Sequence, residues 1–226
     1  SWFVRIELMV GLVGGFSATI LFICFPIASG FGVILYGLIG LTGVLVGLEI
    51  PLLMRILKDR MAFDKMVNQV FSFDYIGALA ASILFPLLLV PQLGLIRTSL
   101  FFGMINLGIG IYLAFHLRRN IKRAMWLQTT GVVLLLTELI AFAYANQIMD
   151  ISESLSYNDR VVYSASTPYQ RIAITKNKKE LRLFLNGNLQ FSSIDEYRYH
   201  EALVHPALSA MPTARKVLVL GGGDGL

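Results

Sequence analysis

The sequence has 226 residues, of which 56% are hydrophobic, and this composition is too apolar for an ordinary water-soluble domain. It carries 19 Lys and Arg against 14 Asp and Glu. Because most of the basic residues lie in short connections between apolar runs, as in membrane proteins, we predict no nucleic-acid partner. The single cysteine, Cys24, excludes a disulfide within the chain, and the histidines show no metal-ligand spacing, so we predict no metal site.

Apolar runs long enough to cross a bilayer, about 20 residues each, occupy the first two thirds of the chain. The five runs are Leu8–Ala28, Phe31–Leu57, Val70–Val90, Leu95–Leu117 and Met125–Gln147. They predict an α-helical membrane bundle of about five spans over residues 1–150, with the lipid bilayer as its partner. Small residues spaced four apart should allow close helix packing, and these are Gly11 and Gly15, Gly43 and Gly47, and Gly77 and Ala81.

Positive charge is concentrated on one side of these runs. The basic residues of that side are Arg5, Arg55, Lys58, Arg60, Lys65, Arg118, Arg119, Lys122 and Arg123, whereas Arg97 flanks the other side. The positive-inside rule places the basic side in the cytoplasm. With five spans, the C-terminal part would then lie on the opposite side.

Acidic residues also occur within the apolar runs. Glu49 and Asp74 should lie toward the basic side, where Arg55 could pair with either. Glu138 lies near the middle of its run, where an acid is costly and marks a functional site or a paired polar contact. We predict that a protonated Glu138 contacts Asn106, and the alternative is a site for a cationic amine.

The composition changes after residue 150. Residues 161–165, 169–175 and 181–185 are predicted strands, and Asn186-Gly187 is a strong hairpin signal before residues 188–191. The segment Ser193-Ile194-Asp195-Glu196 is a capping box and predicts a helix from about Ser193. The continuously apolar Val217–Leu220 predicts a buried parallel strand, and the glycines from Gly221 onward predict a tight turn near a ligand. These elements suggest a small β domain at residues 151–192 and the start of a nucleotide-binding α/β domain at residues 193–226.

Four of these segments, in this order, resemble the spermidine synthase family, the polyamine aminopropyltransferases. They are Tyr169-Gln170, Leu185–Gln190, Asp195–Glu201 and Gly221–Gly225, and the similarity covers roughly residues 161–226. The preceding two thirds resemble the multi-span membrane domain of some bacterial members. The resemblance implies a Rossmann-like catalytic domain, a bacterial inner-membrane location, and possible homo-oligomers through the β domain.

The implied reaction transfers an aminopropyl group from decarboxylated S-adenosylmethionine to a putrescine-like amine and releases methylthioadenosine. By the resemblance, the donor would be bound by Gln170, Gly221, Gly222, Gly223 and Asp224. The polyamine would be bound by Gln190, Tyr199, His200 and Asp224. An acid at Asp224 suits the ammonium of a decarboxylated donor, whereas it would repel the carboxylate of intact S-adenosylmethionine.

The family's catalytic carboxylate is expected after Leu226, so no catalytic residue is assigned in this chain. We expect the chain to be a fragment of a longer enzyme and to be inactive alone. A cytoplasmic donor conflicts with the orientation that the charges predict, and the side that the C-terminal part faces stays open. The alternatives are an S-adenosylmethionine-dependent methyltransferase and an amine-binding membrane transporter or sensor.

Overall fold

The computed structural model describes residues 2–58, 61–116, 118, 124–167 and 169–221. The chain forms two compact units, Ser1–Ser156 and Tyr157–Leu226. The first unit extends past residue 150 because a helix that begins at Ala145 continues to Ser156. Each unit is described by itself below.

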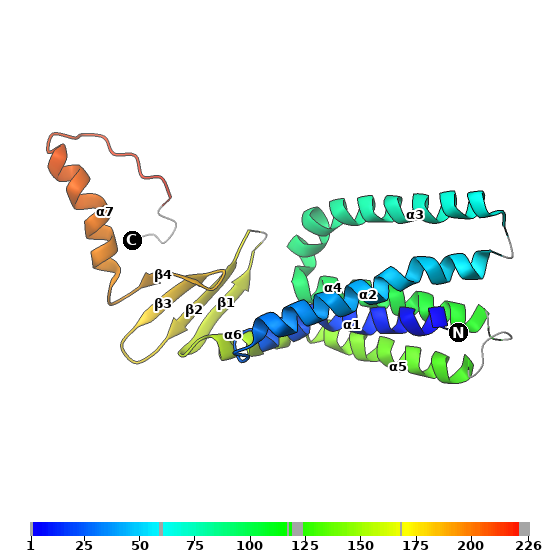
Figure 1. Ribbon diagram of the computed structural model, residues 1–226. Helices are drawn as coiled ribbons and strands as arrows, with labels where there is room; N and C mark the ends of the chain where they lie inside the picture. The colour runs from blue at the N-terminus through cyan, green and yellow to red at the C-terminus, as the bar shows by residue number, and fades with distance from the viewer. Residues whose placement is uncertain (1, 59–60, 117, 119–123, 168, 222–226) are drawn as a thin grey trace. The chain divides into compact units, whose positions relative to one another are not determined.

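The first unit consists of helices (Figure 1). They are α1 (Trp2–Cys24), α2 (Phe31–Leu57), α3 (Phe63–Leu84), the π-helical turn η1 (Phe85–Leu89), α4 (Val90–His116), α5 (Ala124–Ala143) and α6 (Ala145–Ser156). The short break at Ser29-Gly30 turns the chain back, so α1 and α2 form an antiparallel pair (Figure 1). Helix α1 begins, α2 ends and α3 begins at one end of the unit, which is the end that carries Arg5, Lys58 and Lys65.

The expectation of five separate spans is not confirmed. Among the described residues, four helical segments are long and apolar enough to cross a membrane, and the third of them is the continuous segment Phe63–His116. This segment contains two of the predicted apolar runs, in α3 and α4. The π-helical turn with Pro86 and the non-helical Gly94 (φ 76°) let the chain reverse between α3 and α4 without an extended loop (Figure 1).

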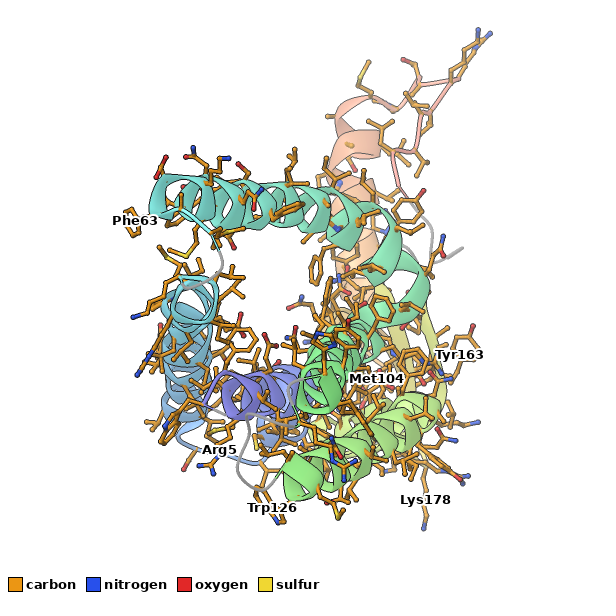
Figure 2. The ribbon with its side chains drawn as sticks, turned by 90° about the vertical axis from the view of Figure 1, so that its right-hand side faces the viewer. Arg5, Phe63, Met104, Trp126, Tyr163 and Lys178 are labelled. Atoms are coloured by element: carbon orange, nitrogen blue, oxygen red, sulfur yellow. The ribbon has the colours of Figure 1, made fainter. Side chains whose placement is uncertain are left out.

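Helices α1, α4 and α5 pack side by side and hold the largest core of this unit (Figure 2). Its fully buried members include Val4, Leu107 and Leu127, one from each helix. The close approach predicted at Gly11 is confirmed, because a Cβ atom there would lie 2.7 Å from Leu107 Cγ. The same prediction is wrong for Gly43, Gly47 and Gly77, where such an atom would meet no described atom within 4 Å. Spacing alone does not reveal which glycines face a neighbouring helix.

The second unit contains a four-stranded antiparallel sheet in its described residues, with strand order β1-β2-β3-β4. The strands are β1 (Arg160–Ser166), β2 (Arg171–Lys176), β3 (Leu181–Leu185) and β4 (Asn188–Ser192), followed by helix α7 (Glu196–Ala210). The predicted hairpin is confirmed: Asn186 and Gly187 have φ of 51° and 80°, the left-handed conformation that a two-residue turn between twisted strands needs. A small antiparallel sheet is therefore present in this part of the chain, as predicted.

Ser193 does not start the helix. Helix α7 begins at Glu196, and its N-cap residue Asp195 makes no side-chain capping hydrogen bond. The Ser193 hydroxyl instead accepts a hydrogen bond from the Leu181 N–H at 2.9 Å, and the Ser193 N–H donates to the Leu181 carbonyl. Ser193 therefore closes the open end of the β3–β4 hairpin, and the capping-box prediction is wrong.

Val217–Leu220 does not form the predicted buried strand. These four residues are in irregular backbone, and their side chains are between 69% and 86% exposed. A parallel strand needs neighbouring strands for its hydrogen bonds and helices over both of its faces. The described residues supply neither, because the four strands of the sheet pair only with one another.

Candidate functional site

The described residues predicted to bind donor and amine lie in the second unit: Gln170 before β2, Gln190 in β4, Tyr199 and His200 in α7, and Gly221 after α7. Arg182, Glu180 and Asp159 form a network of ion pairs at the end of the sheet. The sequence analysis did not predict this network. Arg182 donates from Nε to Glu180 Oε1 at 2.7 Å and contacts Glu180 Oε2 at 2.6 Å, and a longer contact of 3.4 Å joins it to Asp159. Ser192 Oγ donates a hydrogen bond to Glu180 Oε1 at 2.6 Å, the same oxygen that accepts from Arg182 Nε. The hydrogen bond from Arg182, aided by that from Ser192, holds the pKa of Glu180 below its usual value.

Gln190 is the extra residue of a β-bulge in β4. Leu183 pairs with Phe191 and Phe184 pairs with Leu189, so Gln190 has no partner of its own on β3. A bulge locally disrupts the ladder and redirects side chains, and such bulges are frequent next to active sites. Gln190 is exposed. The sequence motif identified this residue, but the bulge depends on pairing with β3 and could not be derived from it.

Gln170 lies immediately before β2, in a turn organised by Thr167. The Thr167 hydroxyl accepts the Gln170 N–H at 3.0 Å and donates to the Gln170 carbonyl at 2.9 Å. The neighbouring Arg171 is fixed by hydrogen bonds to Ser164 and Ser166 across the β1–β2 hairpin. The backbone at Gln170 is therefore well defined by local bonds, and its side chain is half-buried.

Tyr199 and His200 are adjacent on α7. Their rings meet edge to face with centroids 5.4 Å apart, and Tyr199 is 65% exposed. Nδ1 of His200 lies 2.9 Å from the main-chain oxygen of Glu196, which can only accept, so Nδ1 donates in this contact. Nδ1 also lies 3.3 Å from the Glu196 carboxylate. Helix α7 therefore holds the two rings in contact with each other.

The described structure does not bring α7 and the sheet residues into one site. Helix α7 has no buried residue and makes no extensive contact with any other described helix or strand. Gln170, which immediately precedes β2, and Gln190, on β4, are separated by β3. Of the glycine turn, Gly221 is described and has φ of 95°, whereas Gly222, Gly223 and Asp224 lie outside the described residues.

Glu138 does not make the predicted contact with Asn106. Its side chain on α5 is fully buried, and neither carboxyl oxygen has a hydrogen-bond partner among the described residues. The carboxyl group instead lies against Gly15 of α1 and Gly103 of α4, where a Cβ atom on Gly103 would come within 2.7 Å of it. The prediction failed because the absence of side chains on these two glycines creates the space that the carboxyl group fills.

Comparison with known proteins extends the similarity beyond the C-terminal motifs. Residues 196–226 match the model of the spermine/spermidine synthase domain. The chain is 51% identical, over 99% of its length, to a polyamine aminopropyltransferase of Leptospira interrogans, and 48% identical, again over 99%, to polyamine aminopropyltransferase 2 of Ralstonia nicotianae. A polyamine aminopropyltransferase of Mycobacterium tuberculosis is 37% identical over the same share. The chain covers 45% of the length of each of these relatives.

No solved structure was found to match the chain. The similarity to the aminopropyltransferases nevertheless includes the helical unit as well as the sheet and α7, because it runs through 99% of the chain. Along nearly its whole length, which is slightly less than half the length of these relatives, the chain is similar to the polyamine aminopropyltransferases, and its residues 196–226 match the spermine/spermidine synthase domain.

Proposed function

We propose that this chain is part of a membrane-bound polyamine aminopropyltransferase. The observation that carries the proposal is the 51% identity, over 99% of the chain, to a protein named polyamine aminopropyltransferase. The helical unit would anchor the enzyme in the bacterial inner membrane through its long apolar helices. Because the relatives are about twice as long as this chain, the remainder of the enzyme would supply what the second unit lacks.

In the proposed reaction, a neutral amine nitrogen of putrescine attacks the carbon next to the sulfonium of decarboxylated S-adenosylmethionine. A nitrogen–carbon bond forms, the carbon–sulfur bond breaks, and methylthioadenosine leaves with the electron pair. The attacking nitrogen then loses a proton, and the product is spermidine. The protein has to hold two flexible cations in line, and such orientation supplies much of the rate.

The second unit offers groups suited to these tasks. Gln170 and the turn that includes Gly221, Gly222 and Gly223 would bind the nucleoside end of the donor, and Asp224 would bind its ammonium. The exposed Gln190 and the Tyr199–His200 pair would contact the amine, because a tyrosine face and hydroxyl suit a methylene chain with ammonium ends.

The exposed apolar residues of the second unit fit a fold completed by further chain. Val217–Leu220 and the apolar side chains of α7, such as Leu203, have no covering layer among the described residues. In the proposal, Val217–Leu220 is the first strand of a Rossmann-like sheet, and α7 packs on that domain. The small sheet would also provide contacts for a homo-oligomer.

The test is turnover by the full-length protein with each donor. We expect spermidine and methylthioadenosine from putrescine and decarboxylated S-adenosylmethionine. Methyl transfer from intact S-adenosylmethionine, without aminopropyl transfer, would instead establish the methyltransferase alternative. Binding of amines without turnover of either donor would favour a transporter or sensor.

The variant Asp224→Asn tests the donor assignment in the same protein. Loss of a hydrogen-bonded charge pair in a partly dry site costs about 2–5 kcal/mol, so donor affinity or turnover should fall more than tenfold. Methylthioadenosine, which has no ammonium, should bind nearly as well as before. Asp195→Asn is the matched control, because it makes the same change at an exposed residue whose side chain makes no capping hydrogen bond. An equal loss of nucleoside and donor binding in Asp224→Asn would mean that Asp224 only shapes the turn.

A further inference from the structure

Five of the six described Lys and Arg residues of the first unit lie at one of its ends, where α1 and α3 begin and α2 and α4 end (Figure 1). Figure 2 views the unit from this end, with Arg5 labelled. The sixth, Arg97, lies toward the other end, where its Nε donates to the Phe142 carbonyl at 3.4 Å and its guanidinium group lies over the Phe142 ring. The five residues, which we call the basic end, are all exposed, and they are Arg5, Arg55, Lys58, Lys65 and Arg118.

The charges of the basic end are not neutralised by neighbouring acids. Within the described residues, none of the five side chains forms an ion pair, so the pairing of Arg55 with Glu49 or Asp74 that the sequence suggests is not found. One exposed acid, Asp64, lies in the outermost described turns of these helices. The basic end therefore carries a clear surplus of positive charge.

Buried contacts hold the helix ends that carry these charges together. Val4, next to Arg5 in α1, packs with Ala114 of α4 and Ala124 of α5 in the largest core of the unit. The side-chain amide of Gln128 in α5 also donates to the Ala114 carbonyl at 3.0 Å. The ends of α1, α4 and α5 are therefore fixed relative to one another.

Helix α2 is attached to α1 at the same end by a second buried cluster. Ile6 of α1 packs with Leu45 and Leu52 of α2, and Leu52 lies one helical turn before Arg55. The positive-inside rule requires positive charge on one side of a membrane but no fixed arrangement of it. Here the packed helices provide a fixed arrangement, as a binding surface needs.

Both tryptophans of the chain also lie at this end. Trp2 is in the first turn of α1 and Trp126 in the first turn of α5, and they are 65% and 59% exposed. The Arg5 guanidinium lies over the Trp2 ring, 5.3 Å from its centre, and such a contact orients the group without removing its charge. Exposed tryptophans between apolar helices and basic residues are typical of the headgroup level of a membrane.

This combination fits a phospholipid better than a soluble anion. A soluble anion would contact only the charges. A phospholipid would place its phosphate among the charges, its glycerol region against the tryptophan rings and its acyl chains along the helices, whose sides expose large apolar residues such as Leu12 and Val133. Clusters of Lys and Arg directly beyond the end of a membrane helix attract anionic headgroups in this way.

We propose that the basic end is a binding surface for anionic phospholipids. The inference rests on the membrane anchoring in the proposed function, and it adds the class of lipid and the end of the helical unit that binds it. The guanidinium groups of Arg5, Arg55 and Arg118 each offer paired N–H donors to a phosphate, and Lys58 and Lys65 add point charges. Bound headgroups would neutralise charges that the described protein leaves uncompensated.

The test counts the lipids bound to the full-length protein in a neutral detergent by native mass spectrometry. Phosphatidylglycerol is compared with phosphatidylcholine of the same acyl chains, and glycerol phosphate serves as the soluble anion. We expect phosphatidylglycerol to half-saturate the protein at a concentration at least about tenfold lower than phosphatidylcholine does, and glycerol phosphate not to displace it. Equal affinity for the two lipids would overturn the proposal, and displacement by glycerol phosphate would overturn the assignment to a lipid.

Two double variants locate the surface. Arg5→Gln with Arg55→Gln removes two charges from the basic end, whereas Lys178→Gln with Lys179→Gln removes two exposed charges from the second unit. Each basic residue near an anionic surface contributes about a fivefold factor in affinity, so the first variant should bind phosphatidylglycerol about 25-fold more weakly and the second should bind it as before. The first variant should fold, because both of its changes are at exposed residues without ion pairs. The same affinity in both variants would refute the proposal.

The unmodified protein provides a second measurement. Its preference for phosphatidylglycerol should weaken between about 0.1 and 0.5 M NaCl, because salt screens exposed charges, and a preference independent of salt would contradict an electrostatic surface. Lipid counting needs no turnover, so it is independent of aminopropyl transfer. Binding of neither lipid would overturn the membrane anchoring together with this inference, whereas equal binding of both would leave the anchoring intact and overturn this inference alone.

Discussion

Replacement of Gly103 by alanine tests how tightly α1, α4 and α5 are packed. A Cβ atom at Gly103 would lie 2.6 Å from the Gly15 Cα atom and 2.7 and 2.8 Å from the two carboxyl oxygens of Glu138. The Glu138 side chain could move, but the backbone of α1 at Gly15 could not do so without separating the two helices. We therefore expect Gly103→Ala to destabilise the helical unit.

The magnitude follows from two opposing effects. Overpacking of a close-packed interior costs about 1–3 kcal/mol. Alanine is a better helix former than glycine by about 1 kcal/mol, which offsets part of this cost. Gly108→Ala on the same helix is the matched control, because a Cβ atom there would meet no described atom within 4 Å and only the favourable effect remains. The two variants should therefore differ in stability by about 1–3 kcal/mol, with Gly103→Ala the less stable.

The assay is thermal denaturation of the full-length protein in detergent, followed by loss of the monodisperse peak in size-exclusion chromatography. We expect Gly103→Ala to lose this peak several degrees below Gly108→Ala. If Gly103→Ala proved as stable as Gly108→Ala, α1 and α4 would not approach as closely as the structure shows, and the reasoning would be refuted.

Three further changes probe particular contacts. By itself, Gly15→Ala should destabilise the protein, but in a Glu138→Ala background it should be nearly neutral, because the atoms nearest to its new Cβ belong to the Glu138 carboxyl group. A double-mutant cycle should give a coupling energy of about 0.5–3 kcal/mol, and additive effects would contradict this contact. Gly187→Ala should cost about 1 kcal/mol, because residue 187 has φ of 80°, and hydrogen exchange of the β3–β4 amides should accelerate; unchanged exchange would argue against the left-handed turn. The pKa of Glu180 is lowered by Arg182, so its contribution to stability should be complete above the ordinary value of 4.5 and be lost as the pH falls through the lower folded-state pKa. The difference in melting temperature between wild type and Glu180→Gln should accordingly shrink on acidification, and a difference independent of pH would contradict the assignment.

Local chemistry made several features predictable from the sequence alone. The Asn186-Gly187 turn follows from the ability of these two residues to adopt positive φ, which is a property of neighbouring atoms only. The long apolar helices follow from composition, because a segment that is apolar on all sides has to be covered by lipid or protein. The resemblance of the C-terminal motifs to the aminopropyltransferases likewise depended only on residue order.

Contacts between distant segments decided the rest. Gly15 and Gly43 both belong to pairs of glycines spaced four apart, but of the two only Gly15 packs closely against another helix. The Glu138 carboxyl group packs against Gly15 and Gly103, which precede it by more than 30 residues. Ser193 has the sequence of a helix cap, yet its hydroxyl binds Leu181, because the β3–β4 hairpin presents a free N–H beside it. Val217–Leu220 has the composition of a buried strand and no described strand beside it, and a strand exists only where a neighbour completes its hydrogen bonds. The sequence by itself therefore determined the conformations that depend on neighbouring residues, whereas tertiary structure decided which polar groups and glycines meet, since packing depends on segments far apart in the chain.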